Sequence, residues 1–162
     1  MSRALLLLAR FALSAWFGAA TLFVIIGVRE VRFPEFSSPV RDQLVLLRFP
    51  MYYAAGFTLL GLAFASQVLL ILRGWKRPAV LIACGLTGIA LGLMAYDYPC
   101  VYRPLEQMIT PPGQPRPAAF VSLHHWSQNV NAVQLGCALA AALVLCTIDG
   151  PFDRQDLPEA AA

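Results

Sequence analysis

Four long stretches without a charged residue dominate the hydrophobic pattern of the chain. These runs cover residues 11–28, 51–72, 78–96 and 126–148, and they are 18, 22, 19 and 23 residues long. At about 1.5 Å per residue, each is long enough to cross about 30 Å of hydrocarbon as a helix. The pattern predicts an all-α membrane protein, an antiparallel four-helix transmembrane bundle formed by residues 1–150 with spans at 5–28, 51–72, 78–96 and 122–148.

The first run has a second interpretation, because an arginine and then an apolar stretch at the start of a chain also occur in secretory signal peptides. The run is long for a signal core, and no small-x-small cleavage site follows it before Arg29. We therefore expect a membrane span, with Arg10 reaching toward the interface.

The linker between the first two spans predicts a short helix lying in the membrane interface. Ser38 is a suitable N-cap, and Pro39 suits the first helical position. The apolar residues Val40, Leu44 and Leu47 share one face of this helix, whereas Arg41, Asp42 and Arg48 point elsewhere. Such an amphipathic pattern is typical of interfacial helices.

The linker between the third and fourth spans contains six prolines within residues 97–120. Arg103 and Glu106 are three residues apart and predict an ion pair on a second short interfacial helix. Residues 111–117 predict an exposed, extended loop. Beyond the last span, residues 151–162 form a short acidic tail.

Composition supports the membrane assignment. The 162 residues are 59% hydrophobic and 13% charged, whereas a soluble domain is about 45–50% apolar and about 25% charged. The mean hydropathy is +0.65. These values exclude a disordered protein, a nucleic-acid module and a disulfide-stapled secreted domain. With a net charge of +3 and no polybasic run, we expect the lipid bilayer as partner and no nucleic acid.

Orientation follows from the distribution of Lys and Arg, which is six against six between the two sides. Three of the positive charges lie in the five-residue turn 73–77. Because such a turn is difficult to translocate, we expect it in the cytoplasm, with both termini, and the protein in the cell membrane.

Small residues recur every four positions on two spans. They are Cys84, Gly88 and Gly92 on the third span and Ala132, Gly136 and Ala140 on the fourth. This spacing lets helix backbones approach closely in lipid. We interpret both stripes as packing faces within the bundle, with a homo-oligomer as the alternative.

The fourth span begins with an unusual polar stripe. His124, Ser127 and Asn131 follow i, i+3, i+7 spacing, and Gln134 continues them one turn deeper. Polar side chains in a membrane helix usually face the bundle interior. We therefore predict a polar pocket near the outer end of this span. The other expected pocket residues are Trp16 as its floor, Tyr52 and Tyr53 as its walls, and Asp97 and Glu106 as its rim. The alternative is a set of structural interhelical hydrogen bonds, worth about 0.6 kcal/mol each.

A metal or haem site has little support in the pattern. His124 and His125 are the two histidines, and neighbours on a helix point about 100° apart, so they do not address one metal from the same face. A copper-type site of His124 with Met94 or Cys100 remains an alternative. The metal is therefore unknown, no cofactor is required, and the absence of a phosphate loop, an HExxH motif or a catalytic triad order favours a non-enzymatic protein.

Several landmarks together resemble one family. They are Trp16-Phe17-Gly18 with Phe23, Phe49-Pro50 with Tyr52-Tyr53 and Gly56, and the LHxxSxxxN pattern at residues 123–131. Over about residues 11–146 the chain resembles the transmembrane protein 205-like family of four-helix membrane proteins. It departs from the usual bacterial members at His125, where they carry a small residue, and in the proline-rich segment 110–117.

The resemblance implies a four-helix membrane fold, distantly similar to copper-resistance D-like proteins and to a four-helix membrane protoporphyrinogen oxidase. The family has no firmly assigned reaction, and its eukaryotic relatives are linked to platinum-drug resistance. Three hypotheses follow. The first is a protein that binds or passes a small solute or metal, the second a structural or accessory membrane subunit, and the third a membrane redox enzyme of the haem-pathway type.

Overall fold

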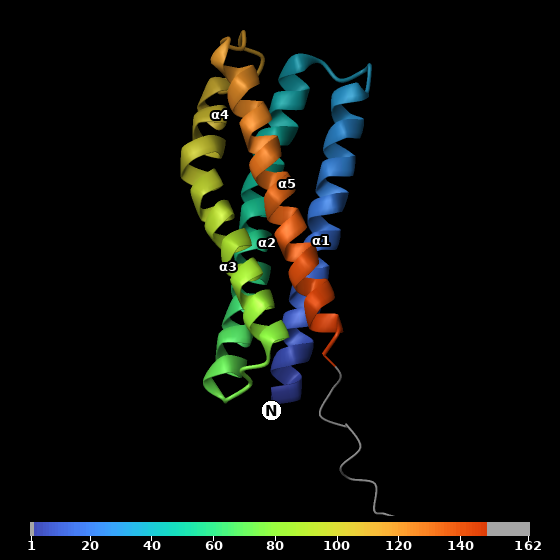
Figure 1. Ribbon diagram of the computed structural model, residues 1–162. Helices are drawn as coiled ribbons and strands as arrows, with labels where there is room; N and C mark the ends of the chain where they lie inside the picture. The colour runs from blue at the N-terminus through green and yellow to red at the C-terminus, as the bar shows by residue number, and fades with distance from the viewer. Residues whose placement is uncertain (1, 149–162) are drawn as a thin grey trace, which may run out of the picture.

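The computed structural model describes residues 2–148, and within this range the chain is helical, with no strand (Figure 1). Its elements are α1 (Ser2–Arg32), α2 (Ser38–Leu72), α3 (Pro78–Asp97), the π-helical segment η1 (Tyr98–Tyr102), α4 (Arg103–Met108) and α5 (Ala119–Cys146). The predicted four-helix bundle is confirmed. The predicted acidic tail lies outside the described residues.

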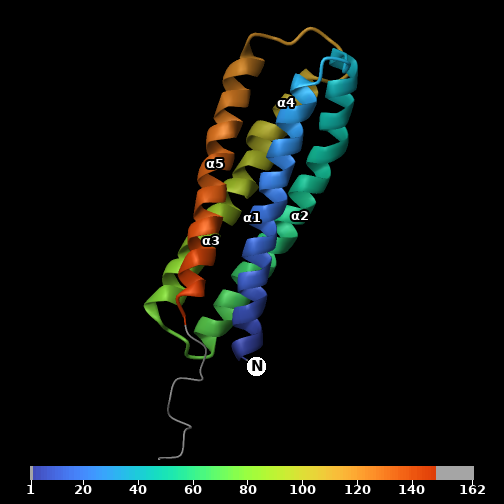
Figure 2. The same ribbon diagram turned by 90° about the vertical axis from the view of Figure 1, so that its right-hand side faces the viewer.

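The four long helices form a closed ring in which α1 contacts α2 and α5, and α3 contacts the same two helices. Figures 1 and 2 show them antiparallel, with the start of α1, the α2–α3 turn and the end of α5 at one end of the bundle. The α1–α2 connection and the loop before α5 lie at the opposite end. We refer to this opposite end as the loop end.

The bundle is apolar both inside and outside. Trp16, Leu60 and Met94 are completely buried, yet Phe11 and Met51 on the outer surface are 69% and 70% exposed. A helix that is hydrophobic all round belongs either in a large core or in a membrane. All four helices are also long and apolar enough to span a bilayer. The molecule is therefore a multi-pass membrane protein.

The prediction of a separate interfacial helix before the second span is wrong. The helix does begin at Ser38, with Ser37 rather than Ser38 as its N-cap, but it continues without interruption through Pro50 to Leu72. The pattern separated the two segments because Arg41, Asp42 and Arg48 precede the uncharged run, and a proline also disfavours a helix interior. The Pro50 ring lies on the exposed side, while the flanking Phe49 and Tyr52 pack inward and stabilise the continuous helix.

The small-residue stripes do not form the packing faces that we predicted. On α5, Ala132 and Gly136 are exposed, and the buried face follows Ser127, Gln134 and Ala138 instead. On α3, Gly92 is exposed, and only Gly88 is close to another helix, where an added Cβ would lie 3.2 Å from the Phe64 ring. The small residues that lie buried between helices are therefore other ones, such as Ala83 and Ala90 on α3 and Ala138 and Ala141 on α5.

Arg10 holds the end of α5 in place. Its guanidinium donates to the Leu145 carbonyl from Nε (3.0 Å) and Nη2 (2.7 Å), and Nη2 also donates to the Ile148 carbonyl (2.5 Å). The last carbonyls of a helix have no partner within the helix, so an arginine from a neighbouring helix can satisfy them.

We expect Arg10→Met to lower the free energy of unfolding by about 1–3 kcal/mol, since it removes charge-assisted hydrogen bonds to the last carbonyls of α5. Equilibrium unfolding in mixed detergent micelles measures this change. Arg29→Met, at an exposed position on the same helix, is the control and should change stability little. Equal effects of the two substitutions would contradict the capping role.

Candidate functional site

The polar face of α5 meets two adjacent tyrosines of α2 and the last residue of α3. The Tyr52 hydroxyl donates to Asn131 Oδ1 (2.9 Å), and Asn131 Nδ2 donates to the Ser127 carbonyl (2.9 Å). The Tyr53 hydroxyl donates to Asp97 Oδ2 (2.5 Å). The side chains of Ser127 and Asn131 lie near the Asp97 carboxylate, but neither makes a hydrogen bond to its Oδ1 atom. We call these five residues the Asp97 cluster.

We predicted Asp97 at the rim of the pocket, but it lies at the centre of this cluster. The residue is only 1% exposed, and its Oδ1 atom is buried without a hydrogen-bond partner. It continues the buried face of α3, which includes Thr87, Ala90 and Met94 at alternating three- and four-residue spacing. One carboxylate oxygen is therefore bound to Tyr53, and the other remains available as an acceptor.

An aromatic frame surrounds the cluster. On one side Trp16 packs against Tyr52, with the ring centroids 5.0 Å apart. On the other side Tyr98 and Tyr102 contact Tyr53, at centroid distances of 5.0 and 4.9 Å. Both of these tyrosines belong to η1, which follows Asp97 directly. Because a π-turn holds one more residue than an α-turn, it changes the direction of the side chains that follow, and such turns are frequent at functional sites.

The predicted inward orientation of His124 is wrong. Its side chain is exposed, stacks on Phe120 at 5.7 Å and lies 3.2 Å from the Gln128 amide through Nε2. An α-helix turns about 100° per residue, so Gln134 points within about 20° of Ser127, whereas His124 points about 60° to the side. The predicted polar stripe on the fourth span was therefore wider than the face of α5 that is buried in the bundle.

Glu106 lies at the periphery of the site. Its Oε1 atom accepts from the Tyr102 hydroxyl (2.9 Å), and Oε2 pairs with Arg103 (3.1 Å), so the predicted Arg103–Glu106 ion pair is confirmed. The Tyr102 ring separates this pair from Tyr53. Glu106 is thus linked to the Asp97 cluster through one aromatic ring and is not part of it.

The side chains do not assemble the metal site that we considered as an alternative. Within residues 2–148, no group of three or more His, Cys, Asp or Glu side chains lies close enough to hold a metal ion. Met94 is buried in the core, whereas His124 and Cys100 are exposed. The Met94 sulfur lies in the core and the His124 imidazole lies at the surface, so the two are not placed to bind one metal ion.

A small cleft leads toward the cluster from the side of the bundle. It has a volume of about 230 Å³, opens between α1 and α2, and is lined by Trp16, Phe23, Arg48 and Tyr52, among others. Its walls are almost entirely apolar. Tyr52 therefore connects this cleft, through its hydroxyl, to Asn131 and the polar interior.

We expect Tyr52→Phe to lower the free energy of unfolding by about 0.5–1.5 kcal/mol, the usual net value of one hydrogen bond. A double-mutant cycle with Asn131→Leu isolates this interaction. The two changes should couple by a similar amount, measured by equilibrium unfolding in detergent micelles. Strict additivity would mean that the Tyr52–Asn131 hydrogen bond contributes nothing to stability.

No protein-family model matches the chain, and searches of curated proteins and of solved structures give no match either. The observations above define a class, a four-helix multi-pass membrane protein with a carboxylate buried at the meeting point of three helices.

Proposed function

We propose that this protein is an integral protein of the cell membrane that binds a small, positively charged solute at the Asp97 cluster. The observation that carries the proposal is the buried Asp97 carboxylate, which has one oxygen bound to Tyr53 and the other unpartnered. Ionisable residues inside membrane bundles are rare, and they usually mark the path or the binding site of an ion, a proton or a ligand.

Charge balance indicates the sign of the ligand. Among the described residues, no Lys, Arg or His forms an ion pair with Asp97. A buried carboxylate without a counter-charge is costly, so it binds either a proton or another cation. A cationic solute would therefore displace the proton and use the free Oδ1 atom.

The surroundings of Asp97 also suit a cation. The ring centroids of Tyr53, Tyr98 and Tyr102 lie 4.9–5.7 Å apart, and aromatic faces attract positive charge. Tyr52 and Asn131 add a hydroxyl and an amide that can orient a polar solute. The cleft between α1 and α2 offers a lateral approach from the lipid side to Tyr52.

Thermal unfolding of the purified protein with a panel of cations tests this function. The panel contains tetraethylammonium, ethidium, spermidine, and the chlorides of copper and zinc. We expect at least one cation to raise the melting temperature of the wild type but not of Asp97→Asn, which keeps the shape of the side chain and removes its charge. Glu35→Gln, at an exposed position in the α1–α2 connection, is the control. The same response in all three proteins would contradict the proposal.

A structural role is the second candidate, because the Tyr53–Asp97 hydrogen bond joins α2 to α3. In that case Asp97→Asn lowers stability and leaves every ligand response unchanged. The haem-type redox alternative has less support, because His124 and His125 are both exposed. The resemblance to the transmembrane protein 205-like family is compatible with either of the first two functions.

We further propose that the end of the bundle carrying the α2–α3 turn faces the cytoplasm. The start of α1 and the end of α5 lie at this same end (Figure 1), so both termini would be cytoplasmic. A reporter fused after Arg77 or after Ile148 should therefore give an internal signal. An external signal at either position would reverse or refute this orientation.

A homo-oligomer is a further proposal. Ala132 and Gly136 are small and exposed on α5, so a second copy of the protein could pack against this helix.

A further inference from the structure

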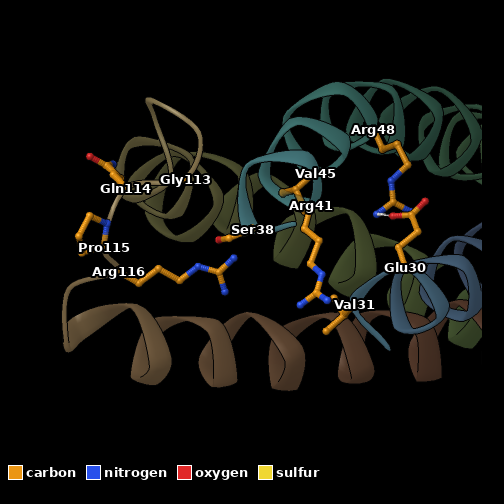
Figure 3. A pocket seen from close by; sticks show the side chains of 10 residues that line it. All are labelled: Glu30, Val31, Ser38, Arg41, Val45, Arg48, Gly113, Gln114, Pro115 and Arg116. Atoms are coloured by element: carbon orange, nitrogen blue, oxygen red, sulfur yellow. Dashed lines mark ion pairs between the residues drawn. The ribbon is translucent and has the colours of Figure 1, made fainter. Parts of the chain in front are cut away.

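A second, larger cleft lies at the loop end of the bundle and is separate from the Asp97 cluster. It has a volume of about 430 Å³ and lies between the end of α1, the start of α2 and the loop before α5. Three arginines line it, namely Arg41, Arg48 and Arg116, together with one acid, Glu30. Figure 3 shows Arg41 and Arg116 extending from α2 and from the loop toward the same space.

The walls of this cleft are fixed by a buried carboxylate. Asp42 is 1% exposed, pairs with Arg116 Nη2 (2.7 Å) and accepts from the Gly113 backbone N–H (2.9 Å). Gly113 has a φ of +88°, a conformation that favours glycine. The loop is therefore held against the first turns of α2, and Arg116 is oriented before any ligand arrives.

Two of the arginines that line the cleft have a side-chain donor without a partner. Arg48 pairs with Glu30 (2.6 Å), yet its Nη1 atom is buried without a partner. Arg41 donates to the Phe33 carbonyl (3.2 Å), and its Nε atom is buried without a partner. Among the described residues, Arg41 forms no ion pair. Buried donors of this kind are rare in folded proteins and call for an explanation such as a bound ion.

The charges leave the cleft positive. Three guanidinium groups face two carboxylates, those of Glu30 and the underlying Asp42, so one positive charge is uncompensated. Planar guanidinium groups match phosphate oxygens through paired hydrogen bonds. We propose that this cleft binds a phosphate group, with Arg41 as the principal contact and Arg48 Nη1 and Arg116 as supporting donors.

The position of the cleft allows two sources for the phosphate. A helix of 35 residues, the length of α2, rises about 52 Å, whereas the hydrocarbon layer is about 30 Å thick. Some of α2 therefore extends beyond the hydrocarbon, and its first turns at the loop end are at the level of lipid headgroups or outside it. The phosphate can belong to an anionic lipid, as in other basic pockets between membrane helices, or to a soluble phosphate compound.

Native mass spectrometry of the detergent-solubilised protein separates these sources. One arm titrates phosphatidylglycerol against the zwitterionic phosphatidylethanolamine, and the other titrates inorganic phosphate and pyrophosphate. In at least one arm we expect saturable binding that Arg41→Gln weakens roughly tenfold, the effect of losing one charge-assisted hydrogen bond. Arg32→Gln, at an exposed position outside the cleft, is the matched control and should bind like the wild type.

The two arms of the experiment identify the source of the phosphate group, and both test whether the cleft binds phosphate. Binding of phosphatidylglycerol alone assigns a lipid headgroup, and binding of inorganic phosphate or pyrophosphate assigns a soluble ligand. Arg41→Lys retains the positive charge but not the planar guanidinium group, so its affinity should lie between those of the wild type and Arg41→Gln. No saturable binding in either arm, or equal weakening by Arg41→Gln and Arg32→Gln, would overturn the proposal. Within residues 2–148 the hydrogen bond of the Arg41 side chain goes to the Phe33 carbonyl and not to Asp42, so its replacement leaves the Asp42 anchor intact.

Discussion

Tyr53→Phe is expected to lower the free energy of unfolding by about 1–3 kcal/mol, the usual cost of leaving a buried hydrogen-bonding group unsatisfied. The substitution removes a single oxygen and leaves the ring packing unchanged. Asp97 then loses its hydrogen bond from Tyr53, and its other oxygen is already unpartnered. In a membrane no water replaces the lost donor, so the carboxyl remains unsatisfied.

Restoring an apolar pair should recover most of this loss. Asp97→Leu in the Tyr53→Phe background removes the unsatisfied acceptor together with its missing donor, and such paired replacements are often nearly neutral. Tyr96→Phe, at an exposed position on α3, should have no measurable effect. Equilibrium unfolding in mixed micelles compares the wild type, the two single variants at Tyr53 and Tyr96, and the double variant. A double variant as unstable as Tyr53→Phe would show that the hydrogen bond is not the cause.

Gly56→Ala is expected to cost about 1–3 kcal/mol, the usual range for overpacking a core. An added Cβ would lie 2.7 Å from Met94 Sδ and 2.8 Å from the Trp16 ring. The Met94 side chain is flexible and can move, but the indole is completely buried and held against Tyr52. The backbone of α2 would therefore have to shift away from α1.

Gly61→Ala provides the matched control on the same helix, because nothing lies within 4 Å of a Cβ at that position. There the substitution should be neutral or stabilise by up to about 1 kcal/mol, since alanine favours a helix more than glycine does. Thermal unfolding in detergent compares the two variants. If Gly56→Ala were as stable as Gly61→Ala, the close approach of α1, α2 and α3 at this level would be wrong.

The number and type of the main elements could be predicted because four uncharged runs leave few alternatives to membrane helices. The continuity of α2 through residue 50 could not be predicted in the same way. The charged residues before position 49 favoured a separate interfacial helix, whereas in the structure Phe49 and Tyr52 pack against the core of the bundle on both sides of Pro50. Local propensity is a weak guide where tertiary contacts decide.

The candidate site was predicted in part. Tyr52, Tyr53, Ser127 and Asn131 come together as the stripe on the fourth span suggested, but Asp97 was placed at the rim and His124 inside. A usable signal for Asp97 was present. The residue continues the three- and four-residue spacing of the buried face of α3, so its inward direction could have been read from that face.

The basic cleft could not be predicted from local patterns. Asp42 looks like a water-facing residue of an amphipathic helix, yet it is buried because Arg116, 74 residues further along the chain, supplies the counter-charge. Likewise, the partner of Arg48 is Glu30, at the end of another helix. Long-range pairs between single charges leave no periodic signal in a sequence.

The central claim is that a cation binds at the Asp97 carboxylate. Infrared difference spectroscopy tests it most directly, because it records the change in a carboxyl group itself when a ligand is added. With the cation that most stabilises the wild type, the account predicts loss of a protonated-carboxyl band and gain of a carboxylate band. Both changes should be absent in Asp97→Asn and retained in Glu35→Gln. A difference spectrum in which Asp97→Asn keeps both bands, or a wild-type spectrum without either, would contradict the account.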